Sequence, residues 1–153
     1  MATRIVVLGG GFGGMYAARA LKRRLGKNAD IELVTAQNYF VFQPLLPEVG
    51  AGSIAAPHAV SPLRFLLKGV AVRKAMVESV DFERRIVTVF QGIQRRPTEV
   101  GYDHLVIALG QGVDLSRMPG LEEHALKMKS LEDARRLRAH VIERLEHADI
   151  TRL

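Results

Sequence analysis

The stretch Arg4-Ile-Val-Val-Leu8, followed by Gly9-Gly-Gly-Phe-Gly-Gly14, decides the fold of this chain. The first run is apolar and β-branched, which is typical of a strand buried on both faces of a parallel sheet. Met15 to Leu25 then repeats apolar residues at helical spacing, and Gly26 stands where a helix should end. A second strand is predicted at Ile31 to Thr35. This order of strand, glycine turn, helix and strand indicates a Rossmann-like α/β fold with a doubly wound parallel sheet.

The segment from Ala36 to Pro57 is predicted to be irregular. Four residues that break regular structure interrupt it, namely Pro44, Pro47, Gly50 and Gly52. The segment is also rich in apolar residues, and a loop of this length inside a compact domain is usually functional. A short helix is expected after it, starting at Ser61-Pro62 and reaching Leu67.

The second half of the chain is predicted to continue the sheet and to end in a helix. Ser130 and Asp133 have the spacing of a helix N-cap and its acidic partner, and apolar residues then line one helix face as far as Leu145. Residues 111–129 are expected to be a connecting segment. Three further strands are expected, of which the first two form a small antiparallel β-meander: Val70–Val80, Ile86–Phe90 and Leu105–Leu109.

The composition is that of an ordinary globular domain. Of 153 residues, 48% are hydrophobic and 25% are charged, which predicts one folded domain. The lack of cysteine excludes disulfides and thiolate sites within these residues, and the five histidines lack metal-ligand spacing, so no metal is expected. The net charge of +6 is spread out and does not alternate with aromatic residues, which argues against nucleic acid as a partner. Because neither a signal peptide nor a membrane span is recognisable, the cytoplasm is the expected location.

Three of the glycines match the G-x-G-x-x-G fingerprint of dinucleotide-binding turns. Gly9 would permit the tight turn, Gly11 would let the backbone approach a pyrophosphate, and Gly14 would let the helix pack closely on the strand. The N-terminus of the following helix offers N–H groups and a partial positive charge to phosphates. The sequence therefore predicts a dinucleotide site at this turn.

The fingerprint also expects an acidic residue at the end of the second strand, where it binds the adenosine ribose. Thr35 stands there instead and can make one such contact. Glu32 cannot replace it, because strand alternation points Glu32 to the opposite face of the sheet. No Arg or Lys occurs in Ala36 to Asn38, so the 2′-phosphate of NADP is not favoured. These motifs alone leave both FAD and NAD open.

Asn38-Tyr-Phe-Val-Phe-Gln-Pro-Leu-Leu-Pro-Glu-Val49 resembles the segment after the second strand in type II NADH:quinone dehydrogenases and their sulfide:quinone relatives. Five further stretches are similar to the same family, so the resemblance runs nearly end to end: Gly9–Leu21, Ser61–Leu67, Tyr102–Gly110, Pro119–His124 and Ser130–Ala134. In that family a first Rossmann unit binds FAD and a later one binds NAD(P)H. The resemblance implies that residues 1–153 are the N-terminal portion of an FAD-binding domain, with the NAD-binding domain and the second FAD segment absent.

The resemblance also implies which residues contact FAD. The glycine turn would hold the pyrophosphate, Gln43 and Pro44 would lie by the flavin, and Val77 would present its backbone to the adenine. Ala108 and Gly110 match an Ala-Thr-Gly turn of the family in which Leu109 replaces the threonine. The full set of expected cofactor contacts is Gly9, Gly11, Phe12, Gly13, Gly14, Thr35, Gln43, Pro44, Val77, Ala108 and Gly110.

The implied activity is that of an NAD(P)H:quinone oxidoreductase, which passes a hydride from NAD(P)H to FAD and electrons to a quinone. Because the cofactor supplies this chemistry, no catalytic side chain is expected here, and the chain alone is expected to be inactive. Two alternatives stay open, namely a sulfide:quinone oxidoreductase-type flavoprotein and a stand-alone nucleotide-binding module without turnover.

Two kinds of association are also expected. The family's C-terminal part, which is absent here, would give peripheral contact with the inner face of the cell membrane. A homo-oligomer is expected to form through apolar surface around Phe40, Phe42 and Leu45, because exposed apolar patches tend to associate.

Overall fold

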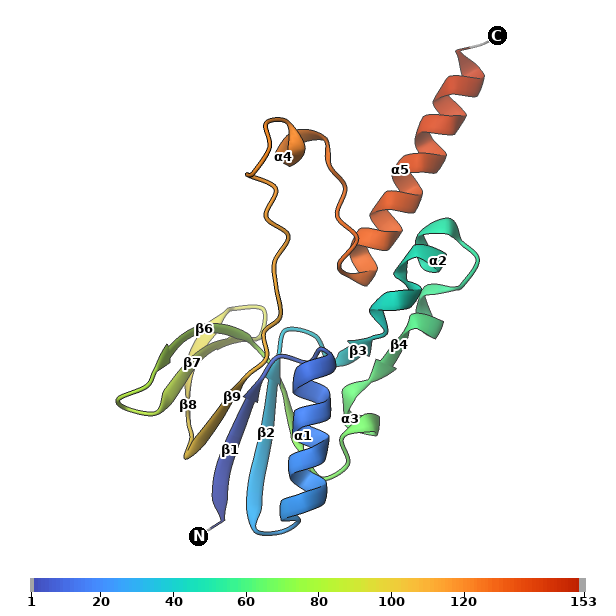
Figure 1. The fold of residues 1–153 in the computed structure, drawn as a ribbon. Helices are drawn as coiled ribbons and strands as arrows, with labels where there is room; N and C mark the ends of the chain where they lie inside the picture. The colour runs from blue at the N-terminus through green and yellow to red at the C-terminus, as the bar shows by residue number, and fades with distance from the viewer. Residues whose placement is uncertain (1, 152–153) are drawn as a thin grey trace. The chain divides into compact units, whose positions relative to one another are not determined.

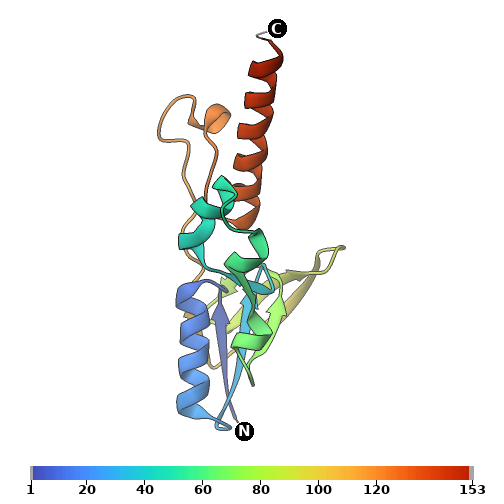
Figure 2. The same ribbon diagram turned by 90° about the vertical axis from the view of Figure 1, so that its right-hand side faces the viewer.

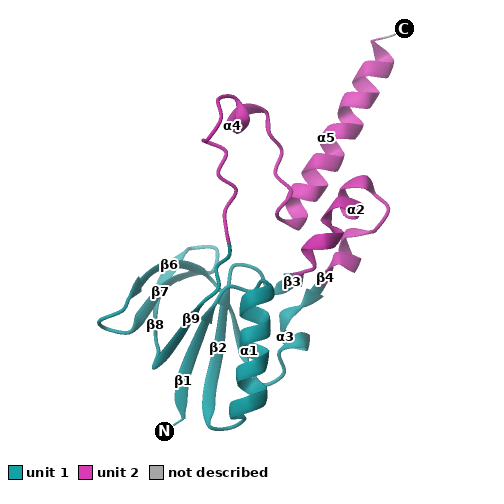
Figure 3. Cartoon of the chain, viewed as in Figure 1, with its two compact units in different colours: residues 1–40, 61–110 teal, residues 41–60, 111–153 magenta. Residues whose placement is uncertain are grey.

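The computed structural model describes residues 2–151, and the chain divides into two compact units (Figure 3). Unit 1 consists of residues 1–40 and 61–110, and unit 2 of residues 41–60 and 111–153. Two 3₁₀ turns, Gln43–Leu45 and Ala56–Ala59, accompany the main elements. In chain order these elements are β1 (Thr3–Leu8), α1 (Phe12–Leu25), β2 (Ala29–Thr35), β3 (Tyr39–Val41), α2 (Leu46–Ala51), β4 (Val60–Pro62), α3 (Leu63–Leu66), β5 (Ala71–Lys74), β6 (Met76–Asp81), β7 (Ile86–Gln91), β8 (Arg96–Gly101), β9 (His104–Ile107), α4 (Leu121–His124) and α5 (Leu131–Ile150).

Unit 1 is built on a four-stranded parallel sheet with the spatial order β5-β2-β1-β9. The helix α1 covers one face of this sheet (Figure 1). The antiparallel sheet β6-β7-β8 covers the opposite face, as the turned view shows (Figure 2). The predicted Rossmann-like α/β class, with a parallel sheet and a small antiparallel meander, is confirmed.

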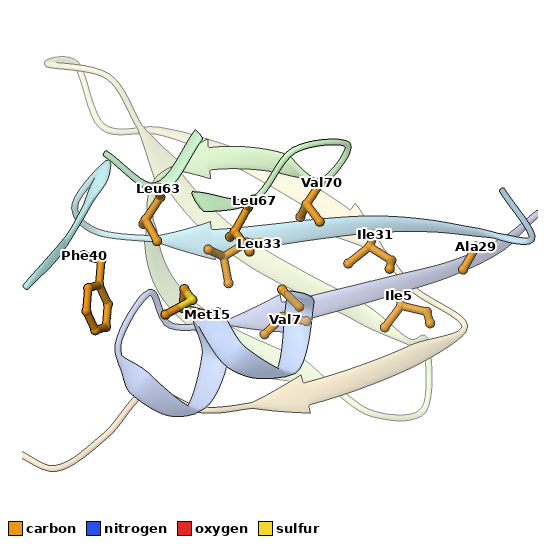
Figure 4. Packing of buried hydrophobic residues seen from close by; sticks show 11 residues of the cluster. Ile5, Val7, Met15, Ala29, Ile31, Leu33, Phe40, Leu63, Leu67 and Val70 are labelled. Atoms are coloured by element: carbon orange, nitrogen blue, oxygen red, sulfur yellow. The ribbon is translucent and has the colours of Figure 1, made fainter. Parts of the chain in front are cut away.

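The two faces of the parallel sheet belong to two separate hydrophobic clusters. Alternate residues of β1 divide between them, since Ile5 and Val7 face α1 whereas Val6 and Leu8 face the meander. This arrangement explains why the strand sequence is apolar at consecutive positions rather than at alternate ones. Figure 4 shows the cluster on the α1 side, which also contains Met15, Ala18, Ala29, Ile31, Leu33, Phe40, Leu63, Leu67 and Val70.

The strand predicted over Val70–Val80 is wrong as a single element. The structure divides it at Ala75 into β5, which extends the parallel sheet, and β6, which opens the meander. Ala75 is small and 5% exposed, and its N–H donates to the Thr35 carbonyl oxygen at 2.8 Å. The run Val70–Val80 contains neither proline nor glycine, so the sequence carries no breaker that would mark such a transfer between sheets.

The prediction that Ala36 to Pro57 is irregular is also partly wrong. This segment contains β3, the 3₁₀ turn Gln43–Leu45, α2 and the start of the 3₁₀ turn Ala56–Ala59. Pro44 and Pro47 lie in the first turns of helical elements. A proline there gives up no hydrogen bond, since the first N–H groups of a helix have no partner within it. The prolines therefore begin helical turns in this segment, although the sequence analysis took them as breaks.

Two smaller expectations also differ from the structure. Ser61-Pro62 does not start a helix, because both residues belong to β4, and Pro62 is the N-cap residue of α3. Phe40 does not belong to an exposed apolar surface. Its side chain is 8% exposed in the α1-side cluster and meets the Phe12 ring edge-to-face, with 4.8 Å between the ring centroids.

Unit 2 contains the long helix α5, which begins as the sequence predicts. The Ser130 hydroxyl accepts from the Asp133 N–H at 3.1 Å, and the Asp133 carboxylate accepts from the Ser130 N–H at 2.8 Å. Leu131 and Ala134 are buried against α2, whereas Leu145 is 66% exposed, so only the first turns of the predicted apolar face are covered. None of the helices within residues 2–151 combines the length and the apolarity that crossing a bilayer requires.

A buried carboxylate on β2 links three strands of the parallel sheet. The Glu32 side chain is 9% exposed and pairs with Arg4 of β1 at 3.1 Å and with Arg73 of β5. The register partners of Glu32 are Val6 on β1 and Ala71 on β5. Arg4 and Arg73 each stand two residues from one of these partners, so strand alternation puts both arginines on the same, meander-side face as Glu32. Glu32 therefore points away from the face of Thr35, as strand alternation predicts.

The first testable prediction concerns this ion-pair cluster. Glu32→Gln should cost only about 1 kcal/mol of unfolding free energy, because Arg4 and Arg73 are 44% and 28% exposed and can reach water. Replacing both arginines by methionine should cost about 3 kcal/mol, because it leaves a buried carboxylate unpaired. Urea unfolding measures both changes. A greater loss in Glu32→Gln than in the double variant would contradict this assignment.

The second prediction concerns the capping box of α5. Ser130→Ala should lower the unfolding free energy by about 1 kcal/mol. Partial burial alone would raise the pKa of Asp133, but the hydrogen bonds from the N–H groups of Lys129 and Ser130 outweigh it and hold that pKa below its usual range. The stabilisation by Asp133 is therefore complete above the unfolded-state pKa of about 3.9 and disappears as the pH falls through the lower folded-state pKa.

Urea unfolding of the chain and of Asp133→Asn, followed by the helical circular dichroism signal, tests this pH dependence. The stability difference between the two proteins should be present at pH 7 and should shrink as the pH is lowered toward 3. A difference that stays constant over that range would show that the Asp133 charge does not stabilise α5.

Candidate dinucleotide-binding site

The glycine turn lies at the point where the order of the parallel strands reverses. The chain leaves β1 toward β2 on one side, whereas β9 lies on the other side of β1. The segments that follow the carboxyl ends of β1 and β9 therefore diverge. In open α/β sheets the ligand crevice lies at this switch point.

Gly9 and Gly14 are required by the packing of the protein itself. Gly9 has a φ of +104°, and a Cβ there would lie 2.2 Å from the carbonyl oxygen of Ala108. A Cβ at Gly14 would lie 1.8 Å from the carbonyl oxygen of Gly9. Both contacts are to backbone atoms, which cannot move aside as a flexible side chain can. The turn therefore seats α1 directly on the ends of β1 and β9.

Gly11 differs from these two glycines, because no protein atom lies within 4 Å of the Cβ that it lacks. It is the N-cap residue of α1, and neither a side-chain cap nor an acidic residue is present in the first turn. The open space at Gly11 thus borders the positive end of a fourteen-residue helix. The residues present fit a pyrophosphate, which needs close backbone approach and N–H donors.

Thr35 lies beneath the turn, and its side chain is almost fully covered. It is 6% exposed, and its hydroxyl accepts from the Gln37 N–H at 3.4 Å. A Cβ at Gly10 would lie 2.5 Å from this hydroxyl oxygen and 3.0 Å from a methyl group of Leu63. Gly10 is therefore a further structural requirement of the turn, which the G-x-G-x-x-G pattern misses because the residue occupies a variable position.

The remaining predicted contacts divide between the two units. Ala108 lies next to the turn and donates its N–H to the Leu8 carbonyl oxygen at 2.8 Å, and Gly110 follows with a φ of +77°. Val77 is half-buried on β6, opposite Val89. Gln43 and Pro44 belong to unit 2, where the Gln43 side-chain amide donates to the Lys129 carbonyl oxygen at 3.1 Å.

The two non-motif residues of the turn have different surroundings. The Phe12 ring is 38% exposed, stacks on Tyr16 with 6.5 Å between centroids, and also meets Phe40. A Cβ at Gly13 would touch the Ala108 side chain at an ordinary 3.6 Å. Phe12 thus joins α1 to the cluster of Figure 4, while Gly13 faces the end of β9.

Lys74 stands close to the glycine turn in the fold, although the sequence analysis does not single it out. It ends β5 and is the register partner of Thr35, so it stands at the same edge of the sheet as the glycine turn. The strand pairing brings it there, because the two residues are far apart in the chain. Within residues 2–151, no group of three or more His, Asp or Glu side chains is arranged to hold a metal ion.

Comparisons with known proteins agree with this geometry. The chain is 35% identical to the mitochondrial external alternative NAD(P)H-ubiquinone oxidoreductase B1 of Solanum tuberosum, over 96% of the chain and 26% of that protein. It is 32% identical to the type II NADH:quinone oxidoreductase Ndh of Mycobacterium tuberculosis, over 95% of the chain and 31% of that protein. NDH2 of Plasmodium falciparum superposes with a TM-score of 0.87, over 100% of the chain and 31% of that structure, at 23% identity, which supports the fold alone.

The chain thus spans about a quarter to a third of the length of these relatives. The sequence model of the pyridine nucleotide-disulphide oxidoreductases matches residues 3–150, from the first strand through the last helix. With the glycine turn, the strand order and this match in agreement, the chain belongs to the pyridine nucleotide-disulphide oxidoreductase family.

Proposed function

We propose that this chain is the FAD-binding portion of an NAD(P)H:quinone oxidoreductase of the type II kind. A bound flavin would supply the redox chemistry by accepting a hydride from NAD(P)H and giving electrons to a quinone. Two relatives support this assignment, since their names state NAD(P)H or NADH as donor and a quinone as acceptor. Contact with a membrane surface would bring such an enzyme to its quinone.

The residues of this chain would bind and orient the dinucleotide. The backbone at Gly11 would approach the pyrophosphate, and the N-terminus of α1 would oppose the phosphate charge. Val77 would place its backbone at the adenine, while Gln43 and Pro44 would lie at the flavin end. No side chain of the chain needs to act as acid, base or nucleophile, because the protein contributes position and electrostatics.

The open space at Gly11 carries the proposal. At Gly9, Gly10 and Gly14, a Cβ would collide with nearby protein atoms. Packing alone therefore explains these three glycines, and they give no evidence for a ligand. Gly11 meets no protein atom and stands at the N-cap of α1, where a side-chain oxygen would otherwise stabilise the helix, so the close approach of a bound phosphate is the reason that we propose for a glycine there.

The third testable prediction follows from this difference. Gly11→Ala should leave the fold intact, because the added Cβ has open space, but should weaken FAD binding roughly tenfold or more. Flavin fluorescence titration measures the affinity, and circular dichroism measures the fold. The matched control is Gly101→Ala, since Gly101 also has no atom within 4 Å of its missing Cβ and lies in β8.

The control variant should bind FAD as the unmodified chain does. Equal affinities of Gly11→Ala and Gly101→Ala would show that the turn does not hold the pyrophosphate. Loss of the folded signal in Gly11→Ala would contradict the open space at this position.

The fourth prediction is that the 153-residue chain alone does not oxidise NADH. Hydride transfer needs two dinucleotides in contact, and the sequence contains one G-x-G-x-x-G turn, at Gly9 to Gly14. The assay follows NADH absorbance with added FAD and a soluble quinone, and free FAD with quinone gives the background rate. Turnover of about 1 per second or faster, the lower end for ordinary enzymes, would refute this prediction.

A further inference from the structure

The short helix α3 carries an exposed aromatic ring between two cations. Leu63 and Leu67 are buried in the α1-side cluster and fix the inner side of this helix. Phe65 follows Leu63 by two residues, a helical rotation of about 200°, so its ring points outward and is 77% exposed. Arg64 and Lys68 stand on either side of it in the sequence, and both are exposed. Single exposed apolar residues are common, and the charge around this one sets it apart.

The last turns of α1 stand next to α3 (Figure 1), and a hollow of about 280 Å³ lies between the two helices. Its apolar lining includes Phe65 and Val70. Its charged lining consists of four cations, namely Arg19, Lys22, Arg23 and Lys68. Among the described residues that line the hollow, none is acidic. This basic hollow lies wholly within unit 1.

The protein does not neutralise the charges of the basic hollow. None of the four cations forms an ion pair with any residue from 2 to 151. Lys22 donates from its ammonium group to the Gly26 carbonyl oxygen at 2.9 Å and so also serves the end of α1. The other three cations are exposed, and no hydrogen bond joins their side chains to the described residues: Arg19, Arg23 and Lys68. The segments that supply the hollow, residues 1–29 and 49–77, contain no Asp or Glu.

Helix electrostatics explain only part of this cluster. The C-terminal end of a helix attracts cations, which favours Lys22 and Arg23 in the last turn of α1. Arg19 and Arg23, however, are four residues apart, a spacing at which like charges on a helix repel each other. Lys68 follows α3 and adds a further positive charge at the same place. An anionic partner accounts for cations that gather around an apolar lining, whereas the stability of α1 does not.

We propose that the basic hollow docks on a bilayer surface that contains anionic phospholipid. The cations contact the lipid phosphates, and the Phe65 ring enters the boundary between headgroups and acyl chains. Cations around an outward apolar side chain are the pattern of such interfacial binding, because the charges supply attraction and the ring supplies apolar burial. The choice of a bilayer as the partner rests on the proposed function, since a lipid-soluble quinone acceptor lies in a membrane.

The charge pattern of the fold differs from that of the sequence. The sequence analysis describes the net charge of +6 as spread out, whereas the fold gathers cations of α1 with one that follows α3. The sequence analysis also assigns membrane contact to an absent C-terminal part. The basic hollow gives unit 1 a membrane contact of its own.

The test uses tryptophan fluorescence, because the chain contains no tryptophan of its own. Phe65→Trp is titrated with vesicles of equal parts phosphatidylglycerol and phosphatidylcholine, and with vesicles of phosphatidylcholine alone. The anionic vesicles should shift the emission to shorter wavelength, because the ring at residue 65 leaves water. The neutral vesicles should leave the emission unchanged.

Phe82→Trp is the matched control. Phe82 is also strongly exposed, at 67%, but it stands between Asp81 and Glu83, which an anionic surface repels. Its emission should not respond to either kind of vesicle. The two variants thus compare the same substitution in basic and in acidic surroundings.

Charge variants of the tryptophan-labelled chain measure the share of binding that the hollow supplies. Arg23→Gln combined with Lys68→Gln should weaken binding to anionic vesicles roughly 30-fold, because each cation near such a surface contributes roughly fivefold. Arg135→Gln combined with Arg136→Gln removes the same net charge from exposed residues of α5 in unit 2. This second pair should keep most of the binding.

Three results would overturn the inference. The first is an emission that stays unchanged in Phe65→Trp or shifts equally in Phe82→Trp. The second is an equal loss of binding in the α5 pair, because the attraction would then come from net charge alone. The third is a response of Phe65→Trp to poly-glutamate but not to vesicles, which would identify an acidic polypeptide as the partner.

The proposed function is measured separately, by FAD titration without vesicles. Arg23 and Lys68 lie at the end of α1 opposite the glycine turn, so their double variant should bind FAD as the unmodified chain does. Intact FAD binding without vesicle binding refutes the inference alone. Vesicle binding as expected in a chain that does not bind FAD supports the inference and refutes the proposed function.

Discussion

The carbonyl oxygen of Gly9 occupies the place where any side chain at residue 14 would begin, and unit 1 is arranged around this contact. A Cβ at Gly14 would lie 1.8 Å from that oxygen, so α1 can rest on the end of β1 only because residue 14 is glycine. The same turn passes over Ala108 at the end of β9. One close backbone approach thus joins the first helix, the first strand and the last strand of the sheet at the point where the strand order reverses.

Burial on both faces then fixes the strands in register. Because neighbouring residues of β1 enter different clusters, a slip of one residue would exchange the α1 side for the meander side along the whole strand. The Glu32 carboxylate restricts the register further, because it pairs with an arginine from each neighbouring strand on the same face of the sheet. Register in turn brings Lys74 beside Thr35, so the packing that stabilises the sheet also determines which groups stand at the edge next to the glycine turn.

The glycine fingerprint combines two kinds of requirement that a sequence pattern does not separate. Gly9 and Gly14 are required because a side chain there would collide with the backbone. Gly10 is required for a similar reason, although the fingerprint allows any residue at this position. At Gly11, by contrast, no protein atom lies within 4 Å of the missing Cβ, so the packing of the chain does not require a glycine there. The family's name refers to disulphide chemistry, whereas this chain has no cysteine, so these residues supply no thiol redox chemistry.

The sequence by itself determined the elements whose signals are local. The β-branched run before Gly9, the helix that ends at Gly26 and the Ser130–Asp133 capping box all follow from propensity, backbone freedom and short-range hydrogen bonds, and the structure contains each of them. Only the tertiary structure decided the outcomes that depend on distant partners. Ala75, whose N–H donates to Thr35, divides one predicted strand between two sheets, and Phe40 is buried because Phe12 and the α1-side cluster cover it. Lys74 comes to lie beside Thr35 in the same way, since strand pairing joins residues that no local pattern relates.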